Sequence, residues 1–311
     1  MAPDRRPRHN PRMNPFDLDD DAGYQRWRDE KLTASPATLD ELIVEVNRLS
    51  SPSRAEIERI QHGCARANMA IFATRDTAGV DKAVLRDFAA RFGLNRLNHN
   101  EGADDDGVTA LSVVEPEQWR KVYIPYTNRP ISWHTDGYYN TEEQQIRGLM
   151  LYCETPAFEG GENALLDHEL AYIHLRDTDP AFIHALMRPD AMTIPANEVD
   201  DHIERPDRPG PVFSVTHADD AQGHSRPRLH MRYTARGRNV VWRDDPDTSA
   251  ARQCLSEFLH SDNPAIFRAT LESGQGLICN NVLHDRSGFN DSDTQKRLLY
   301  RLRFFDRITV A

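Results

Sequence analysis

Cysteine is scarce in this chain of 311 residues, and long apolar runs are missing from it. The four cysteines lie far apart and form no CxxC pair, so neither a disulfide framework nor a zinc ribbon is predicted. Two of them, Cys153 and Cys279, lie in apolar segments and are expected to be small core residues. No apolar stretch approaches the roughly 20 residues that span a bilayer, which argues against a membrane protein.

The chain also has fewer positively charged than negatively charged residues. Lysine and arginine total 38 against 49 aspartates and glutamates, which gives a net charge of −11. An acidic surface repels phosphate backbones, so no nucleic-acid partner is expected. The charge balance and the absence of apolar runs together indicate a globular protein that acts on something other than nucleic acid or lipid.

The N-terminus lacks the apolar core of a secretory signal and reads MAPDRRPRHNPRMNPF. Because this segment is rich in proline and arginine, residues 1–21 are predicted to form a disordered tail. A basic targeting tail is the alternative. With no secretory signal and few cysteines, a cytoplasmic location is the default expectation.

The rest of the chain indicates an α+β protein built around an antiparallel β-sandwich or barrel. Amphipathic periodicity predicts helices near the front, most clearly over residues 82–94. Many short strand-like segments separated by turn residues follow from residue 108 onward. Residues 196–228 are rich in Pro, Asp, Arg and Gly, which predicts an insertion or a lid outside the core.

A histidine and an aspartate stand two positions apart in the segment ISWHTDGYYN, at residues 131–140. On a strand, side chains alternate between faces, so His134 and Asp136 are expected to point the same way. A polar pair at a strand end is the ordinary explanation. A third ligand, His284, follows the buried-looking strand GLICNNVL. Two imidazoles and one carboxylate form the facial arrangement of non-haem Fe(II) oxygenases, whereas zinc more often takes a closed tetrahedral site or three ligands plus water.

The last strand-like segment, RLLYRLRFF, alternates arginine with apolar residues. Arg297, Arg301 and Arg303 share one face of this strand, and a solvated cationic face is the ordinary explanation. Arg297 follows His284 by only 13 positions, however. One hairpin later, the strand lies beside the metal strand, where a guanidinium in the same cavity binds a carboxylate through two hydrogen bonds.

Several motifs together resemble one family. WHTDG (133–137), EGGEN (159–163), NNVLHDRSGF (280–289) and RLLYR (297–301) follow one another behind the segments DELIVEVNRL, AIFATR and LRDFAARFG. Over residues 38–306 the chain resembles the taurine dioxygenase-like (TauD/TfdA) family of Fe(II)- and 2-oxoglutarate-dependent oxygenases, which includes γ-butyrobetaine hydroxylase and clavaminate synthase. The resemblance implies a double-stranded β-helix (jelly-roll, cupin-like) core with flanking helices, in one domain over residues 22–311.

The resemblance also implies roles for individual residues. His134, Asp136 and His284 match the residues that bind Fe(II), and Arg297 matches the residue that binds the distal carboxylate of 2-oxoglutarate. Asn163 stands where many relatives have a threonine that contacts the same co-substrate, and it keeps a donor and an acceptor. Relatives that halogenate have a small residue at the position of Asp136. Its presence favours hydroxylation, desaturation or a related oxidation over halogenation, with 2-oxoglutarate and O2 consumed and succinate and CO2 released.

Substrate contacts are expected from residues around the HxD motif and the distal histidine. The candidates are Arg301, Arg129, Asn128, Tyr138 and Arg286. They suggest a small polar substrate with a carboxylate, such as an amino-acid derivative. The alternative for arginines and tyrosines near a barrel mouth is a structural role, and Arg286 in particular is placed to brace the loop of the distal histidine.

Three readings other than hydroxylation stay open. Desaturation or ring formation uses the same site. A non-catalytic jelly-roll protein keeps the metal without turnover of 2-oxoglutarate. A zinc-dependent hydrolase needs a general base beside the metal water and no arginine for a co-substrate. Relatives are commonly dimers or tetramers, so a homo-oligomer is expected by analogy alone.

Overall fold

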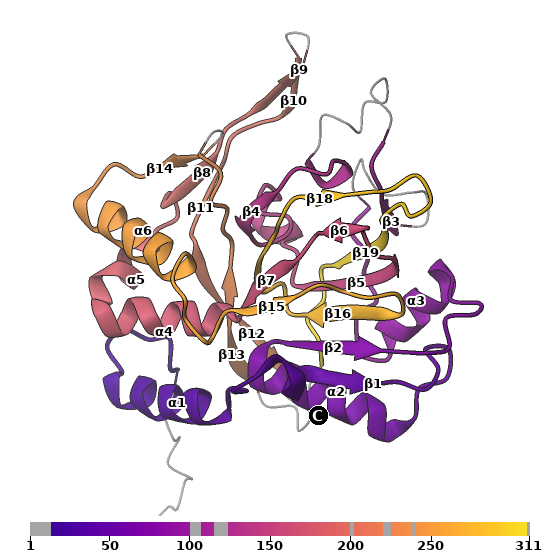
Figure 1. The fold of residues 1–311 in the computed structure, drawn as a ribbon. Helices are drawn as coiled ribbons and strands as arrows, with labels where there is room; N and C mark the ends of the chain where they lie inside the picture. Colours follow the sequence, from indigo (N-terminus) through magenta and orange to yellow (C-terminus); the bar gives the residue numbers. More distant parts are fainter. Residues whose placement is uncertain are drawn as a thin grey trace, which may run out of the picture.

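The computed structural model describes most of the chain, with strands at its centre and helices around them (Figure 1). The described residues are 14–99, 107–114, 124–199, 202–219, 225–237 and 240–309. The α-helices are α1 (Asp21–Ala34), α2 (Arg54–Ala67), α3 (Lys82–Ala90), α4 (His168–Thr178), α5 (Pro180–Leu186) and α6 (Pro246–Leu259). Within these ranges no helix has the length and apolar character needed to cross a membrane.

A six-stranded sheet forms one side of the core. Its order is β1-β2-β16-β5-β19-β3, and all neighbours are antiparallel except β1 and β2. The strands are β1 (Ile43–Glu45), β2 (Met69–Ala73), β16 (Gln275–Cys279), β5 (Gly148–Thr155), β19 (Leu298–Phe304) and β3 (Thr109–Leu111).

A four-stranded antiparallel sheet, in the order β15-β7-β17-β4, forms the other side. Its strands are β15 (Phe267–Ala269), β7 (Asn163–Leu166), β17 (Leu283–Arg286) and β4 (Ile131–His134). The short strands β18 (Phe289–Asn290) and β6 (Glu159–Gly160) pair beside it. The predicted α+β chain around antiparallel strands is therefore observed.

The space between the two sheets is filled by side chains that alternate along the strands. Leu151 and Cys153 of β5 and Leu165 of β7 pack into one cluster between the sheets. The intervening residue Tyr152 faces the opposite way, against helices α2 and α3, in a second cluster. This alternation is what the period of two predicts for strands that are buried on both faces.

The outer face of the four-stranded sheet is covered by helices and by a further group of strands. Leu166 and Leu283 pack there with residues of α4, α5 and α6 in a third cluster. The further strands are β8 (Met192–Ile194), β9 (Asn197–Val199), β10 (His202–Arg205), β11 (Arg208–Gly210), β12 (Phe213–Asp219), β13 (Ser225–Met231) and β14 (Val241–Trp242).

Local sequence signals explain where several helices begin. The Ser53 side chain and Glu56 form a reciprocal capping box at the start of α2. Asp81 caps α3, and Asp245 caps α6 just before a proline at the first helical position. At the end of α2, Asn68 adopts a left-handed conformation with φ of 56°.

The prediction of a disordered tail over residues 1–21 is wrong for residues 14–21. Residues 1–13 lie outside the described part, but residues 14–20 are described and lead into α1. Phe16 is 4% exposed and packs against Trp27 and Tyr172. A single buried aromatic side chain thus fixes the segment before α1, a signal that composition alone does not reveal.

The segment 196–228 is also not entirely outside the core, contrary to the prediction. The hairpin β9–β10 projects from the body of the molecule (Figure 1). Val212 and Phe213, however, are almost fully buried in the cluster on the outer face of the four-stranded sheet. Although most residues of this segment are polar, it contains a short apolar run that packs into this cluster. Its action as a lid stays a prediction.

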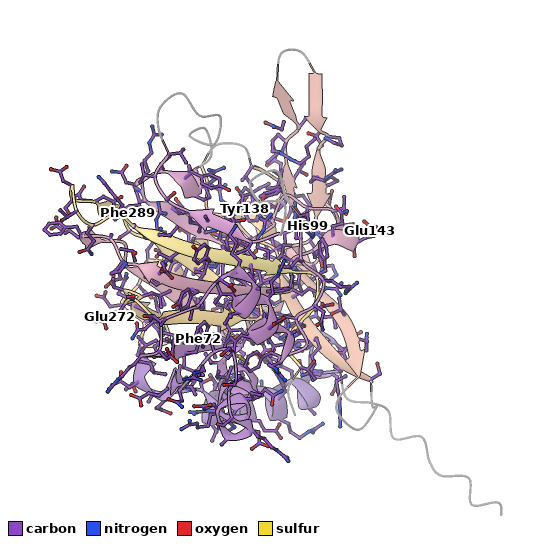
Figure 2. The ribbon with its side chains drawn as sticks, turned by 90° about the vertical axis from the view of Figure 1, so that its right-hand side faces the viewer. Phe72, His99, Tyr138, Glu143, Glu272 and Phe289 are labelled. Carbon is purple, nitrogen blue, oxygen red and sulfur yellow. The ribbon has the colours of Figure 1, made fainter. Side chains whose placement is uncertain are left out.

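Of the strand-like segments expected after residue 108, KVYIPY (121–126) and ISWHTDGYYN (131–140) contain less strand than the sequence suggests. Residues 121–123 lie outside the described part, and Ile124–Tyr126 form a 3-10 turn (η3) rather than a strand. The strand β4 covers only Ile131–His134. Figure 2 shows Tyr138 and Phe289 in the upper part of the strands and Phe72 below them.

Candidate metal centre and active site

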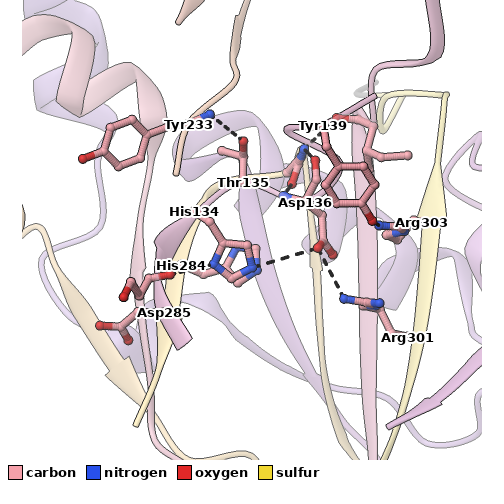
Figure 3. Close-up of polar contacts among 12 residues, drawn as sticks. His134, Thr135, Asp136, Tyr139, Tyr233, His284, Asp285, Arg301 and Arg303 are labelled. Carbon is pink, nitrogen blue, oxygen red and sulfur yellow. Dashed lines mark hydrogen bonds and ion pairs between the residues drawn. The ribbon is translucent and has the colours of Figure 1, made fainter. Parts of the chain in front are cut away.

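Two imidazoles and one carboxylate meet at an end of the four-stranded sheet. His134 and His284 are direct partners in the antiparallel pairing of β4 with β17, and their ring centroids lie 4.2 Å apart. Asp136 Oδ1 lies 4.0 Å from His134 Nε2. One ligand atom from each of the three residues lies within 4.8 Å of the others, and all three residues are buried to a large extent (Figure 3). The structure thus brings together the three predicted metal ligands.

Hydrogen bonds on the far side of each ring favour the tautomer needed for metal binding. His134 Nδ1 lies 2.9 Å from the Ser132 carbonyl oxygen, and His284 Nδ1 lies 2.9 Å from that of Val282. With Nδ1–H donated to a carbonyl, the Nε2 lone pair of each ring is free for a metal. Asp136 Oδ2 is buried and has no hydrogen-bond partner among the described residues. This donor set fits Fe(II).

The strand pairing does not by itself account for the place of Asp136. The prediction that strand alternation aligns His134 with Asp136 is wrong, because β4 ends at His134. Asp136 lies in the following turn, next to Gly137, whose φ is 68°. A Cβ at position 137 would clash with Ile146, so only glycine fits this corner.

Burial and neighbouring charges set the protonation of the ligands. Burial, with His284 beside it, lowers the pKa of His134 to about 3, so this ring is neutral near pH 7. Burial alone would raise the pKa of the Asp136 carboxyl, but Arg301 and Arg303 outweigh it and hold that pKa well below its usual range. Both residues therefore stay in the forms that bind a cation.

The prediction that the last strand lies beside the metal strand is wrong, because β19 pairs with β5 and β3 in the opposite sheet. From there β19 sends its arginines inward rather than to solvent. Arg301 Nη1 lies 3.4 Å from Asp136 Oδ1, and Figure 3 shows it reaching the carboxylate from β19. Arg303 donates to the Tyr139 hydroxyl (2.8 Å) and to Asn98 Oδ1 (2.7 Å). The Nε atoms of both arginines are buried without a hydrogen-bond partner in the described part of the chain. The solvated cationic face that was the ordinary explanation is therefore excluded.

A pocket opens around Arg297, the residue just before β19. Arg297 lines it, is 5% exposed, and has its guanidinium 4.9 Å from the Phe289 ring centroid. No ion pair between described residues involves this guanidinium, whose pKa is lowered by burial. The remaining lining residues are Pro156, Ala157, Gly160, Gly161, Asn163, Thr270, Leu271 and Leu299.

Asn163 joins this pocket to the strand of the distal histidine. Its Nδ2 donates to the Asp285 main-chain carbonyl (2.7 Å), next to His284. Gly160 and Gly161 both have φ of 78°, and a Cβ at Gly160 would meet the Gly288 carbonyl oxygen at 2.5 Å. The Gly-Gly turn therefore lets the 159–163 segment approach the pocket closely.

The proposed substrate residues on the loops have different positions. Arg286 is buried, and its Nη2 donates to the carbonyl oxygens of Thr127 and Arg129, so it braces the loop before β4. The side chains of Asn128 and Arg129 are exposed. The Arg129 carbonyl oxygen accepts from Arg286, and the Asn128 carbonyl oxygen accepts from the Phe289 N–H. The structure does not bring these two side chains to the metal ligands.

Tyr138 lies at the cluster itself. Its ring meets His134 edge-on at 6.5 Å between centroids and is largely buried, which raises the pKa of its hydroxyl. The sequence reading named Tyr138 but assigned no role to Thr270, Asn281 or the Tyr139–Arg303 pair. Arg303 could have been found from the alternation within RLLYRLRFF. Thr270 and Asn281 carry no local signal.

Comparison with known proteins agrees with this geometry. The family model for the taurine catabolism dioxygenase TauD, TfdA family matches residues 31–303. A uridine-5'-phosphate dioxygenase from a Streptomyces species is 30% identical over 188 residues, which cover 57% of this chain and 62% of that protein. The chain thus spans about three fifths of the length of this relative.

Solved structures with similar folds share little sequence with the chain. The non-heme iron oxygenase OrfP, solved with Fe, succinate and (3R,4R)-dihydroxy-L-Arg, has a TM-score of 0.57, 14% identity and 81% coverage of each chain. Asparagine oxygenase, solved with Fe(II), 2S,3S-3-hydroxyasparagine and succinate, has a TM-score of 0.53 and 13% identity and covers 85% of this chain and 93% of its own. At such identities the likeness concerns the fold, and it confirms the predicted double-stranded β-helix.

Proposed function

Because the chain belongs to the taurine catabolism dioxygenase TauD, TfdA family, we propose that it is an Fe(II)- and 2-oxoglutarate-dependent dioxygenase that hydroxylates a small anionic metabolite. The observation that carries the proposal is the convergence of His134, Asp136 and His284, with ligand atoms within 4.8 Å of one another. Arg297, free of any described ion pair, lines a pocket close by and supports the co-substrate assignment.

Three protein ligands on one face of a metal leave three coordination positions open. Bound Fe(II) supplies the activation of O2 that is coupled to the decarboxylation of 2-oxoglutarate to succinate and CO2. The carbonyls of Ser132 and Val282 orient His134 and His284 so that both Nε2 atoms face the ion. Arg301 offsets the negative charge of Asp136 and keeps that carboxylate ionised.

The co-substrate has a matching set of partners. Arg297 is proposed to bind the distal carboxylate of 2-oxoglutarate through two charge-assisted hydrogen bonds, a geometry that a planar guanidinium favours. Asn163 lines the same pocket, and its Oδ1 and second amide hydrogen remain available for the co-substrate. Thr270 also lines this pocket.

The substrate is proposed to carry an anionic group, which binds near Arg301 and Arg303. Both guanidinium groups are buried beside Asp136, and each keeps an unpartnered Nε. The two buried cations share the single carboxylate of Asp136, and buried charge that is not fully compensated is costly, so a bound anion is the natural complement. Tyr138, against His134, is proposed to pack on the uncharged part of the substrate.

Two anionic classes compete. An amino-acid-like carboxylate is the first candidate. A nucleoside phosphate is the second, favoured because the Streptomyces relative is a uridine-5'-phosphate dioxygenase and because guanidinium groups bind phosphate as readily as carboxylate. Arg303, held by Tyr139 and Asn98, would then be a phosphate contact.

The test is a mass-spectrometric screen with Fe(II), 2-oxoglutarate and ascorbate. One panel holds amino-acid derivatives, and the other holds nucleoside 5'-phosphates beside their dephosphorylated forms. A product 16 mass units heavier, formed in step with succinate, is expected for hydroxylation, and a loss of 2 mass units would indicate desaturation or ring formation.

Binding is checked separately from turnover. On anaerobic addition of 2-oxoglutarate to the Fe(II)-loaded protein, a visible charge-transfer band is expected. If that band does not form, and if neither panel releases succinate above the substrate-free rate, the proposed function is wrong. A zinc-dependent hydrolase would instead turn over without O2.

A further inference from the structure

The position of Asp136 raises a question that its strand does not answer. Since β4 ends at His134, the main-chain groups of Asp136 have no ladder partner there. The side chain of Asn281 is their hydrogen-bond partner instead. Asp136 N–H donates to Asn281 Oδ1 (2.8 Å), and Asn281 Nδ2 donates to the Asp136 carbonyl oxygen (3.0 Å).

This double contact restricts Asp136 on both sides of its Cα. A partner on the N–H restrains φ and a partner on the C=O restrains ψ, and together they fix the direction in which the carboxylate leaves the backbone. The residue before it is also held, since Thr135 exchanges hydrogen bonds with the main chain of Tyr233, each 3.0 Å long. The residue after it, Gly137, has no room for a Cβ beside Ile146.

Asn281 is itself held in an uncommon conformation. Its φ is 52°, and among the described non-glycine residues only Asn68 shares such a value. It is 2% exposed, and its Nδ2 also donates to the Ile146 carbonyl oxygen (2.6 Å). A buried residue in this conformation, with two side-chain hydrogen bonds to Asp136 and one to Ile146, indicates that the surrounding structure holds it there for a purpose.

The same segment carries the distal ligand. Asn281 stands three positions before His284 of β17, so the segment that carries one metal ligand also holds the main chain of another. We propose that Asn281 is a positioning residue of the metal centre, which sets the distance of the Asp136 carboxylate from the two imidazoles through both main-chain groups of Asp136. This inference rests on the proposed function, because it assumes that the three side chains bind a metal.

The experiment measures binding of Co(II) alone, by calorimetry and by the visible absorption of the bound ion, with no turnover required. The variant is Asn281→Gly. Glycine accepts a φ of 52° without strain, so the change removes the amide and leaves the turn. Because loss of an outer-shell partner typically costs about 10- to 100-fold in metal affinity, a weakening within that range and a shifted Co(II) absorption spectrum are expected.

Asn68→Gly is a matched control. Asn68 has a φ of 56°, is 3% exposed, and makes three side-chain hydrogen bonds, to Asp167, Asn280 and Arg307. None of these partners is a metal ligand. If Asn281 matters only for folding, both variants should lose stability and should bind Co(II) with the same affinity. The proposal requires that only Asn281→Gly weakens binding.

Two results overturn the inference. One is a Co(II) affinity of Asn281→Gly within about twofold of the wild type, and the other is an equal loss in Asn68→Gly. Should Asn281→Gly not fold, Asn281→Asp replaces it. A carboxylate there keeps the acceptor for Asp136 N–H but loses both donated bonds, so an affinity unchanged from the wild type contradicts the proposal as well. A wild-type protein that binds no Co(II) contradicts the proposed function itself.

Discussion

Two groups of buried charges in this molecule are built in opposite ways. In the first, the paired cluster, Lys31 Nζ lies 2.6 Å from both Asp167 Oδ2 and Glu169 Oε2, and every charge has a partner within the chain. The second, the open cluster, consists of Asp136 with Arg301 and Arg303 of β19, together with Arg297 just before that strand. It has three cations for one carboxylate.

The difference distinguishes charges that stabilise the fold from charges that are placed to bind ligands. A buried charge without a partner is costly, so it persists where something outside the chain completes it. The paired cluster ties α1 to the start of α4 and needs nothing more. The open cluster is complete only with a cation at the ligands and anions at the arginines, which is what a metal, a keto acid and an anionic substrate provide.

The largest effect is expected from removing a ligand of the open cluster. In His284→Ala, Co(II) affinity should fall by more than about 100-fold, since loss of an outer partner alone costs about 10- to 100-fold. Succinate release should disappear with it. Calorimetry and succinate release measure the two effects. His260→Ala removes an exposed histidine at the end of α6 and should change neither. A His284→Ala variant with full Co(II) affinity contradicts the assignment of this ligand.

Breaking the paired cluster should act on stability instead. Lys31→Met leaves Asp167 and Glu169 buried without their ion-pair partner, which is expected to cost about 3–5 kcal/mol in the free energy of unfolding. Urea denaturation measures the loss.

The control for this change is an exposed ion pair. Arg54→Met removes the pair with Glu58 on the surface of α2 and should cost less than about 1 kcal/mol. Co(II) affinity should stay at the wild-type value in both variants. A loss of metal affinity in Lys31→Met, at a temperature where the protein is folded, would mean that the two clusters are not independent.

The open cluster could be predicted from sequence to a much greater degree than the paired one. The HxD motif, the distal histidine and the alternating arginines each have a local pattern, and the strand period predicts which arginines share a face. Lys31 has no such pattern. It is one of several charged residues on α1, and its partners lie more than 130 positions away.

The parts of the site that could not be predicted depend on contacts between distant segments. Strand alternation correctly predicted that Asp136 lies near His134. The reason was wrong, however, because β4 ends at His134, two residues before Asp136. Asn281 and Thr270 reach the site from turns whose geometry appears only in the folded chain. Phe16 was missed likewise, since its burial depends on Trp27 and Tyr172.

The pH dependence of stability sharpens the comparison further. Burial alone would raise the pKa of Glu169, but Lys31 and nearby cations outweigh it and lower that pKa to about 2. An acid whose pKa is lowered on folding contributes stability that is present above its ordinary value of 4.5 and is lost as the pH falls towards 2. Glu169→Gln should therefore cost roughly 2 kcal/mol at pH 7, where a hydrogen bond to a charged group is lost, and progressively less below pH 4.5.

Urea denaturation at pH values between 7 and 3 measures this difference. The Lys31→Met background is the control, because without the ammonium group most of the pH dependence of the Glu169→Gln effect should vanish. A cost that stays constant from pH 7 to pH 3 in the wild-type background would show that Glu169 does not depend on Lys31 for its charge.

The smallest effect is expected where charge is kept and only geometry changes. Arg297→Lys retains a cation in the pocket but loses the planar pair of donors, so the KM for 2-oxoglutarate should rise about tenfold, while kcat changes less. Initial rates of succinate formation at varied 2-oxoglutarate measure both constants. Arg268→Lys is the control, since Arg268 lies on the neighbouring strand β15, is 57% exposed and pairs with Glu162 at 3.5 Å. An equal rise in KM for both variants would mean that charge near the pocket, rather than a specific contact from Arg297, attracts the co-substrate.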